Sequence, residues 1–397
     1  MSATQAYPSS NVQAKPVKKD GTQENEAWYA NGIFVILVHL ISVISFFTYV
    51  PSINTIWLTV ILFQLGTFGI TVGYHRLWSH RAYTARLPYR IALGIMGSLA
   101  FQGSIKWWVL RHRLHHRFTD TEHDPYSAAK GFWFSHMGWI FTKPHYPRMK
   151  LIDDSDLKAD PVVVFQHNHY VSLALLSGLV APTIIAATWG DALGGFLYAG
   201  VFGRVLVWHS TFCINSFAHW AGDQLYSNEI SARGNLLLAI MTNGEDYRNG
   251  YGLFDYDPSK WFIWFFHTCT NQVSSVARVP DNEIRKARSN MKLLEAQREL
   301  DGCDWGADPK TLPIMTYEEY QKKVIDEGKE WILIDQFVLN VEHFKTSHPG
   351  GSKLLKTYYG KDSTRAFYGG LNNHTKAART MLAMFRVAKI EKVETLS

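Results

Sequence analysis

Three histidines lie within five residues in the stretch RHRLHHRF, residues 111–118. On a helix, positions i, i+3 and i+4 share one face, so His112, His115 and His116 can present their imidazoles to one point. Imidazole is the commonest metal ligand in proteins. Histidine-rich sites suit zinc, copper, iron and nickel, among which geometry rather than affinity selects. The stretch therefore predicts part of a transition-metal site.

Two other short motifs supply further candidate ligands. His75 and His80 belong to HRLWSH, and Asn215 and His219 belong to NSFAH, where they are spaced i and i+4. Both motifs follow long apolar segments. A lone histidine at a membrane surface is usually a hydrogen-bonded or solvated side chain, so the elements that carry these motifs decide whether they belong to one site.

Four uncharged or nearly uncharged segments are each long enough to cross about 30 Å of hydrocarbon as a helix. They form two tight hairpins, and the predicted spans are residues 31–50, 53–74, 171–190 and 193–220. The last span contains Arg204, an intramembrane charge that we expect to be packed and paired inside the protein. The apolar stretch 91–105 is too short to span, so we expect it at the interface or folded back into the protein.

The distribution of basic residues predicts the topology. The two hairpin turns carry no Lys or Arg, whereas residues 76–170 carry thirteen. Because positive loops stay in the cytosol, both termini and this long loop are expected there. All three histidine motifs then fall at the same membrane face. This agreement, reached from Lys and Arg alone, favours a shared metal site over isolated surface histidines.

Composition narrows the functional class. A net charge of +6 without a Lys/Arg-rich run favours contact with anionic membrane lipids and argues against nucleic acid as a partner. The three cysteines form no CxxC pair, which fits a reducing, cytosol-facing protein rather than a disulfide framework.

The predicted fold is mostly α. We expect an integral membrane protein with four transmembrane helices and a cytosolic helical cap, followed by a small α+β domain. The expected divisions are a disordered arm over 1–29, the membrane domain over 30–280, a helix and linker over 281–311, and the C-terminal domain over 312–390.

The motifs point to a family. HRLWSH followed by RAYTARLP, HRLHH followed by DPY and GFWFSHMGW, and NSFAHW closely resemble the membrane acyl-CoA desaturases, nearest the fungal Δ9, stearoyl-CoA type. The resemblance implies an O₂-dependent enzyme of the endoplasmic reticulum membrane that introduces a cis double bond into stearoyl- or palmitoyl-CoA. It also implies two irons. The implied iron ligands are His75, His80, His112, His115, His116 and His219, with Asn215 acting through water.

The resemblance further implies a narrow apolar tunnel that bends the acyl chain beside the irons. An unactivated methylene loses hydrogen only to an oxidant of the kind that iron and O₂ supply, because no side-chain base abstracts such a proton at neutral pH. Gly103, Trp107 and Trp108 are candidate tunnel residues by resemblance. Lys143 and Arg148 are candidate contacts for CoA phosphates, with a solvated position facing lipid headgroups as an equal alternative.

A second resemblance covers the C-terminal domain. SHPGGSKLL, residues 347–355, and GGLNNHTKAA, residues 369–378, resemble a cytochrome b5 domain. This implies His348 and His374 as the two axial ligands of heme b. Two axial imidazoles exclude O₂ binding and leave electron transfer. Since the chain has no dinucleotide-binding fingerprint, the resemblance implies electrons that arrive from NADH through a separate flavoprotein, cytochrome b5 reductase.

One motif of the desaturase family has no counterpart. The family carries a third box, His-x-x-His-His, between Gly-Glu and Asp-Tyr-Arg. Here GE, residues 244–245, passes directly into DYR, residues 246–248, and no histidine occurs between His219 and His267. Three alternatives follow: an active desaturase with a mis-spliced or mis-predicted sequence, a variant with one impaired iron site, or an inactive relative that acts as a membrane-anchored heme electron carrier. His267 and the acidic residues of this segment are conceivable substitute ligands.

Overall fold

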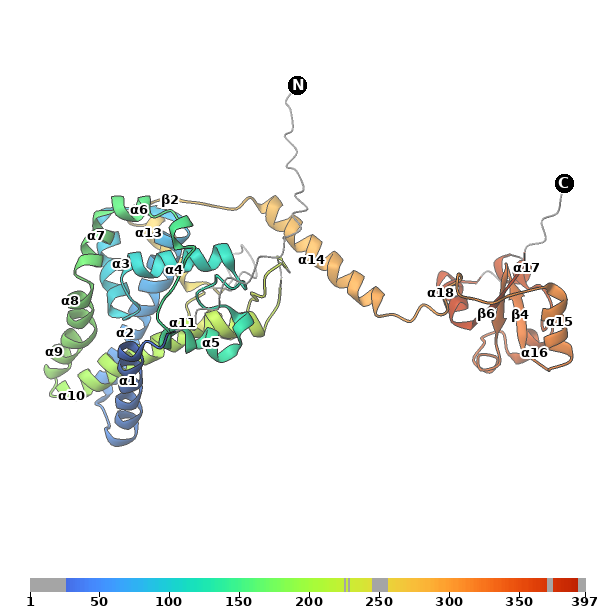
Figure 1. Ribbon diagram of the computed structural model, residues 1–397, viewed down its shortest axis with the longest axis horizontal. Coiled ribbons are helices and arrows are strands. Elements are labelled where there is room, and N and C mark those ends of the chain that lie inside the picture. The colour runs from blue at the N-terminus through green and yellow to red at the C-terminus, as the bar shows by residue number, and fades with distance from the viewer. Residues whose placement is uncertain (1–25, 225, 228, 245–255, 370–373, 392–397) are drawn as a thin grey trace, which may run out of the picture. The chain divides into compact units, whose positions relative to one another are not determined.

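The computed structural model describes residues 26–224, 226–227, 229–244, 256–369 and 374–391, so the first 25 residues of the predicted arm lie outside the described part. The chain forms two compact units, residues 1–292 and 293–397. Both units are drawn in Figure 1.

Four helical stretches are long and apolar enough to cross a membrane, which confirms the predicted fold class. They comprise residues Tyr29–Thr48, Ile53–Ser79, Tyr170–Ala187 and Ala192–Trp220. Large apolar side chains point outward along them. Phe47 is 78% exposed and Val171 is 67% exposed, which is unfavourable in water and favourable against lipid.

The spans pair as two hairpins (Figure 1). The first hairpin consists of α1 (Tyr29–Thr48), α2 (Ile53–Phe68) and the π-helical segment η1 (Gly69–Ser79), which continues α2. The second hairpin consists of α8 (Tyr170–Leu175), η5 (Leu176–Val180), α9 (Ala181–Ala187), α10 (Ala192–Gly194), η6 (Gly195–Phe202) and α11 (Gly203–Trp220).

Asp191 connects the turns of the two hairpins through hydrogen bonds. Its carboxylate accepts hydrogen bonds from the Tyr49 hydroxyl at 2.6 Å, the Ser52 N–H at 2.8 Å and the Thr55 hydroxyl at 2.6 Å. Hydrogen bonds to a charged acceptor are among the stronger ones. This one side chain therefore sets how the first hairpin meets the second.

Arg204 is packed inside the protein, as expected for an intramembrane charge. Its side chain is almost fully buried, and its Nη1 donates to the Leu99 carbonyl at 2.6 Å. Within the described part of the chain its partner is this backbone oxygen and not a carboxylate. The residue thereby ties the end of α3 to the fourth span.

The remaining elements of the first unit form the cap. Its helices and turns are α3 (Leu87–Leu99), α4 (Ile105–Phe118), η2 (Ala128–Lys130), α5 (Phe132–His136), η3 (Gly138–Phe141), η4 (Met149–Leu151), α6 (Ser155–Ala159), α7 (Pro161–Asn168), α12 (Leu236–Met241) and α13 (Pro258–Thr268). The strands β1 (Tyr83–Ala85) and β2 (Val273–Val276) pair antiparallel. The stretch 91–105 folds back into the protein, because α3 packs on η1 and α2.

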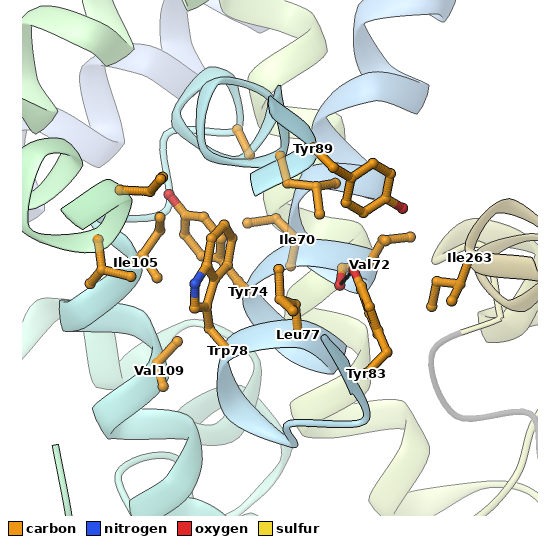
Figure 2. Packing of buried hydrophobic residues seen from close by; sticks show 14 of the residues in the cluster. Ile70, Val72, Tyr74, Leu77, Trp78, Tyr83, Tyr89, Ile105, Val109 and Ile263 are labelled. Atoms are coloured by element: carbon orange, nitrogen blue, oxygen red, sulfur yellow. Dashed lines mark hydrogen bonds between the residues drawn. The ribbon is translucent and has the colours of Figure 1, made fainter. Parts of the chain in front are cut away.

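A buried core holds η1 against α4. Figure 2 shows Tyr74 and Trp78 of η1 beside Ile105 and Val109 of α4. Gly97 of α3 permits this packing, since a Cβ there would collide with the Tyr74 ring. Burying each large apolar side chain contributes roughly 1.5–3 kcal/mol. The core thereby fixes the motif HRLWSH against the motif RHRLHHRF.

The long polar helix α14 (Asp281–Asp301) precedes a small α+β fold. Its helices are α15 (Tyr317–Ile325), α16 (Ser352–Lys356), α17 (Thr364–Tyr368), α18 (Lys376–Met381) and η7 (Leu382–Phe385), and its strands are β3 (Ile314–Met315), β4 (Trp331–Ile334), β5 (Phe337–Asn340) and β6 (Arg386–Ile390). The sheet order is β3-β6-β5-β4, with β3 parallel to β6 and the other pairs antiparallel.

This sheet has a core on each face. On one face Tyr320 of α15 packs on Leu333 and Val338. On the other, Leu355 of α16 and Phe367 of α17 pack with strand residues and with side chains of α18 and η7. The segments that carry His348 and His374 therefore belong to one face of the sheet.

Candidate active site

A π-helical turn brings His75 and His80 together. The His80 N–H donates to the His75 carbonyl at 2.9 Å, a bond from i to i+5. Side chains five residues apart diverge on an α-helix, whereas the wider π turn places them nearly above one another. The two Nε2 atoms lie 2.9 Å apart. Such turns recur at functional sites.

Helix α4 directs two more imidazoles to the same point. The Nε2 atom of His112 lies 3.2 Å from that of His80 and 2.9 Å from that of His116. One ligand nitrogen from each of four histidines lies within 4.8 Å of the others. Metal–imidazole bonds are about 2 Å long, so these separations suit ligands of a single ion. We call His75, His80, His112 and His116 the four-histidine cluster.

Burial keeps His112, one of the two buried members of this cluster, in its metal-binding form. Burial first, and then the neighbouring imidazoles, lower the pKa of His112 well below its usual range. Trp108 stacks on the His112 ring, with ring centres 4.7 Å apart. The neutral imidazole is the form that donates a lone pair to a metal. His112 is therefore ready to bind a metal at neutral pH.

His115 and His219 form a second histidine group, with ring centres 5.7 Å apart. The His115 Nδ1–H donates to the buried Asp124 carboxylate at 2.8 Å, and the His219 Nδ1–H donates to the Ser231 hydroxyl at 2.7 Å. Each bond leaves Nε2 as the ligand atom, the usual arrangement around a metal. The three imidazoles of α4 therefore serve two groups, because His115 points away from the cluster.

The orienting residues were missing from the sequence-based site. Asp120 accepts from the Ser231 N–H and from its hydroxyl, both at 2.8 Å, and so holds Ser231 against His219. Asp120 and Asp124 stand directly after the second histidine motif, in FTDTEHD. Because metal-binding histidines usually donate their other nitrogen to a carboxylate, this acidic run was the available signal.

A cavity of about 800 Å³ adjoins the four-histidine cluster, since His112 lines it, and Asn215, the predicted water-linked ligand, lines it as well. The rest of its lining is largely aromatic and apolar, and it includes the predicted tunnel residues Gly103, Trp107 and Trp108. Its volume falls within the range of about 300–1,000 Å³ common for ligand pockets. The cavity has the size and surface to hold an apolar chain beside the imidazoles.

Gly103 has a conformational and a steric reason to be glycine. Its φ of +92° is one that other residues rarely adopt, and a Cβ there would lie 2.7 Å from the Trp107 ring. On the same ring the Arg111 guanidinium stacks at 3.6 Å from the ring centre. These contacts fix the position of Trp107 in the cavity wall.

Lys143 and Arg148 do not line this cavity. Lys143 forms an ion pair with Glu26 at 2.6 Å and is 57% exposed. Arg148 is also exposed and donates to His123 at 3.4 Å. Their contact with CoA phosphates stays a prediction.

The point at which the family carries its third box lies between Glu245 and Asp246, and residues 245–255 lie outside the described residues. The acidic candidates Glu245 and Asp246 fall there. His267 is described: its Nδ1–H donates to the Val273 carbonyl at 2.9 Å.

The C-terminal unit pairs the two predicted heme ligands. The rings of His348 and His374 have centres 6.3 Å apart. In a metal bound by two imidazoles on opposite sides, the ring centres are separated by two metal–nitrogen bonds of about 2 Å each and by the distance from each nitrogen to its ring centre. The observed separation is of this order. The His374 Nδ1–H donates to the Phe367 carbonyl at 3.0 Å and leaves Nε2 for a metal. The residues present therefore fit a bis-imidazole heme.

Clustered imidazoles beside an apolar cavity in a protein with four candidate membrane spans point to a membrane-bound oxidoreductase, and comparisons agree. Residues 316–391 match the family model described as cytochrome b5-like heme/steroid binding domain. The chain is 37% identical over 384 residues to a probable acyl-CoA desaturase of Schizosaccharomyces pombe, covering 93% of this chain and 79% of that protein.

Further relatives carry similar names. Acyl-CoA desaturase 1 of Saccharomyces cerevisiae is 37% identical over 352 residues, covering 86% of this chain and 69% of that protein. Stearoyl-CoA desaturase 5 of Homo sapiens is 35% identical over 291 residues, covering 68% of this chain and 87% of that protein. The chain belongs to the acyl-CoA desaturase family and carries a cytochrome b5-like domain at its C-terminal end.

Proposed function

We propose that this protein is an O₂-dependent acyl-CoA Δ9 desaturase that introduces a cis double bond into stearoyl- or palmitoyl-CoA for unsaturated fatty acid synthesis. The observation that carries the proposal is the convergence of four imidazoles beside an apolar cavity of about 800 Å³. The electrons would come from NADH through a flavoprotein cytochrome b5 reductase and the b5-like domain.

The proposed cofactors are two irons and heme b. The four-histidine cluster would hold one iron. His115 and His219, with Asn215 through water, would hold the other, for which the described residues supply two imidazoles. His348 and His374 would hold the heme. Iron with O₂ and two electrons supplies an oxidant able to break an unactivated C–H bond, while heme with two axial imidazoles passes single electrons.

The protein's own residues position and shield the reactants. Trp108 covers one face of the His112 ring, and the largely apolar cavity wall would shield an acyl chain from water. Asp124 and Ser231 orient the second histidine group through its Nδ1 atoms. A saturated chain offers no polar handle, so the depth of the cavity beyond Gly103 and Trp107 would choose which methylene pair lies beside the imidazoles.

The proposed location is the endoplasmic reticulum membrane, with both termini and the active site in the cytosol. The absence of Lys and Arg from the hairpin turns, against thirteen in residues 76–170, supports this orientation. The alternative function, a membrane-anchored electron carrier, is not favoured by the desaturase relatives, which match most of the chain.

Expression in a fungal cell that lacks its own Δ9 desaturase tests the proposal. The genomic sequence around codon 245 is read first, so that the tested protein is the one that the organism makes. We expect growth without added unsaturated fatty acids and Δ9-unsaturated chains in the lipids. An unchanged lipid profile from a chain that is present in the membrane and contains heme would contradict the desaturase function and support the electron carrier.

A further inference from the structure

Arg111 places a positive charge in the wall of the apolar cavity. Among the described residues that line this cavity it is the one Lys or Arg, and none of them is an Asp or Glu. The side chain is half-buried, and its Nε lies out of contact with solvent and has no hydrogen-bond partner within the described chain. A charge removed from water is unfavourable unless an opposite charge or hydrogen bonds compensate it. The position of Arg111 therefore favours a ligand that brings a negative charge.

The other arginines of α4 are compensated or lie in water. Arg113 forms an ion pair with Asp156 at 2.6 Å. Arg117 is exposed and donates to the Leu151 carbonyl at 2.7 Å. Arg111 makes no ion pair within the described chain and is half-buried. Of these three arginines it is the one left with neither a carboxylate nor full exposure to water.

Two aromatic rings hold the Arg111 side chain in place. Its guanidinium lies 3.6 Å from the centre of the Trp107 ring and 5.2 Å from that of the Tyr146 ring, and its Nη1 donates to the Trp107 carbonyl at 2.9 Å. Burial lowers the pKa of Arg111 and the neighbouring Tyr146 opposes that shift, so the guanidinium stays protonated at neutral pH. A guanidinium has five N–H donors in a planar fork. The cation can therefore keep these contacts and still bind a ligand.

Neutral polar groups lie at the end of α4 that carries Trp107. Ser104, the N-cap of α4, accepts from the Trp107 N–H at 3.2 Å and shares a hydrogen bond of 2.7 Å with the Nδ1 atom of His167. His167 lines the cavity together with Asn168 and His169. The rest of the lining is largely aromatic and apolar. The cavity thus combines one positive charge and a polar end with an apolar body, which suits an amphiphile that carries one negative charge.

We propose that the cavity binds non-esterified long-chain fatty acids, with the carboxylate on Arg111 and the chain along the apolar lining. A carboxylate and a guanidinium can form two parallel hydrogen bonds. One carboxylate also balances the single charge of Arg111. The thioester of an acyl-CoA is neutral and would leave that charge uncompensated. The phosphates of CoA carry several charges, for which the described lining offers no second Lys or Arg.

This inference goes beyond the proposed function and shares its acyl cavity. A fatty acid on Arg111 would occupy the space of the acyl chain of acyl-CoA, so the two ligands would exclude each other. Free fatty acid would therefore inhibit the proposed desaturation competitively. Binding forms and breaks no covalent bond and needs neither metal nor electrons, so it can be measured apart from the reaction.

The test measures binding to the full-length protein in phosphatidylcholine nanodiscs, in a mildly alkaline buffer in which a fatty acid is ionised. The probes are radiolabelled palmitic acid and palmityl alcohol, which have equally long chains and differ in charge, and binding to empty nanodiscs is subtracted. We expect the acid to bind about tenfold or more tightly than the alcohol. In Arg111→Met this preference should fall to within about twofold, with binding of the alcohol unchanged. The matched control, Arg117→Met, removes an exposed arginine of the same helix and should keep the preference.

A preference for the acid that survives Arg111→Met would overturn the inference, including the case in which that variant instead loses affinity for free coenzyme A, since the cation would then meet a phosphate. If Arg111→Met loses both probes, Arg111→Lys decides, because it keeps the charge. A preference for the acid in Arg111→Lys supports the inference, and equal binding of the two probes overturns it. A protein that binds neither probe nor stearoyl-CoA would contradict the acyl cavity, and with it the proposed function.

Discussion

The two histidine groups of the membrane unit are built differently. The four-histidine cluster takes its ligand nitrogens from η1, from the residue that follows it and from α4, which a buried core locks together, and three pairs of these nitrogens lie 2.9–3.2 Å apart. The second histidine group has two imidazoles, each aimed by a hydrogen bond from its other nitrogen. The first brings four candidate ligands to one point, whereas the second brings two, each held by an orienting residue. Metal affinity should therefore differ between them.

The largest effect is expected from His112→Ala. His112 lies at the centre of the four-histidine cluster, with its Nε2 near both His80 and His116. Removing it should abolish iron binding there and lower desaturation by more than about 100-fold, beyond the usual effect of an orienting residue. Non-heme iron per chain and product lipids measure this. The control is His123→Ala, a partly buried cap histidine outside both groups, and an equal loss in both variants would contradict the assignment.

Asp124→Asn separates the two groups. The Asp124 carboxylate is buried and accepts the His115 Nδ1–H. An amide of the same shape accepts that hydrogen less strongly, so the second group should bind metal about 10–100-fold more weakly. The four-histidine cluster should be unaffected. Metal titration of the apoprotein resolves the two affinities. If only the tighter site binds metal more weakly, His115 belongs to the four-histidine cluster and not to the second histidine group.

Gly103→Ala tests the cavity wall. Its positive φ costs an alanine roughly 1–2 kcal/mol, and the new Cβ would press on Trp107. The control is Gly131→Ala, because Gly131 has a φ of +98° and no atom near its Cβ position. Both variants should lose thermal stability, and Gly103→Ala should lose more because of its contact with Trp107. Only Gly103→Ala should raise the KM for acyl-CoA, by about tenfold, since a small displacement of a bound substrate weakens its productive binding. Equal KM values in the two variants would show that Trp107 does not contact the acyl chain.

The smallest effect is expected at Asp156, which forms hydrogen bonds with Arg113 of α4. Arg113 holds Asp156 with two hydrogen bonds of 2.9 and 2.6 Å. Burial alone would raise the pKa of Asp156, but hydrogen bonds from Arg113 and Arg81 overcome it and lower the pKa to about 2. The unfolded value is about 3.9, so this stabilisation is complete above pH 4 and is lost as the pH falls toward 2.

Thermal unfolding between pH 6 and pH 3 measures this contribution. Asp156→Asn should lower the midpoint at pH 6 and flatten its decline toward pH 3. A decline as steep as that of the unchanged protein would show that other carboxylates govern the acid sensitivity of the cap.

Local sequence patterns predict much of the fold and many of the candidate site residues. The spans follow from apolar length, and the b5-like domain follows from HPGG with a second histidine 26 residues later. The six membrane-unit histidines were also visible as motifs. Each of these features depends on residues within one short segment of the chain, which is why the sequence predicts it.

What the sequence did not reveal depends on tertiary contacts. The spacing of His112, His115 and His116 allows one meeting point, yet His115 turns to Asp124 because the loop after α4 folds back on it. The pairing of His75 with His80 needs a π turn, which no residue pattern here announces. Ser231 lies twelve residues from His219, beyond any helical repeat.

Non-heme iron per chain, measured on the genomically verified full-length protein alongside its heme content, tests the central claim most directly. The account predicts at least one tightly held non-heme iron per chain, which is lost in His112→Ala while the heme stays bound. A protein that carries its full complement of heme but no non-heme iron would contradict it.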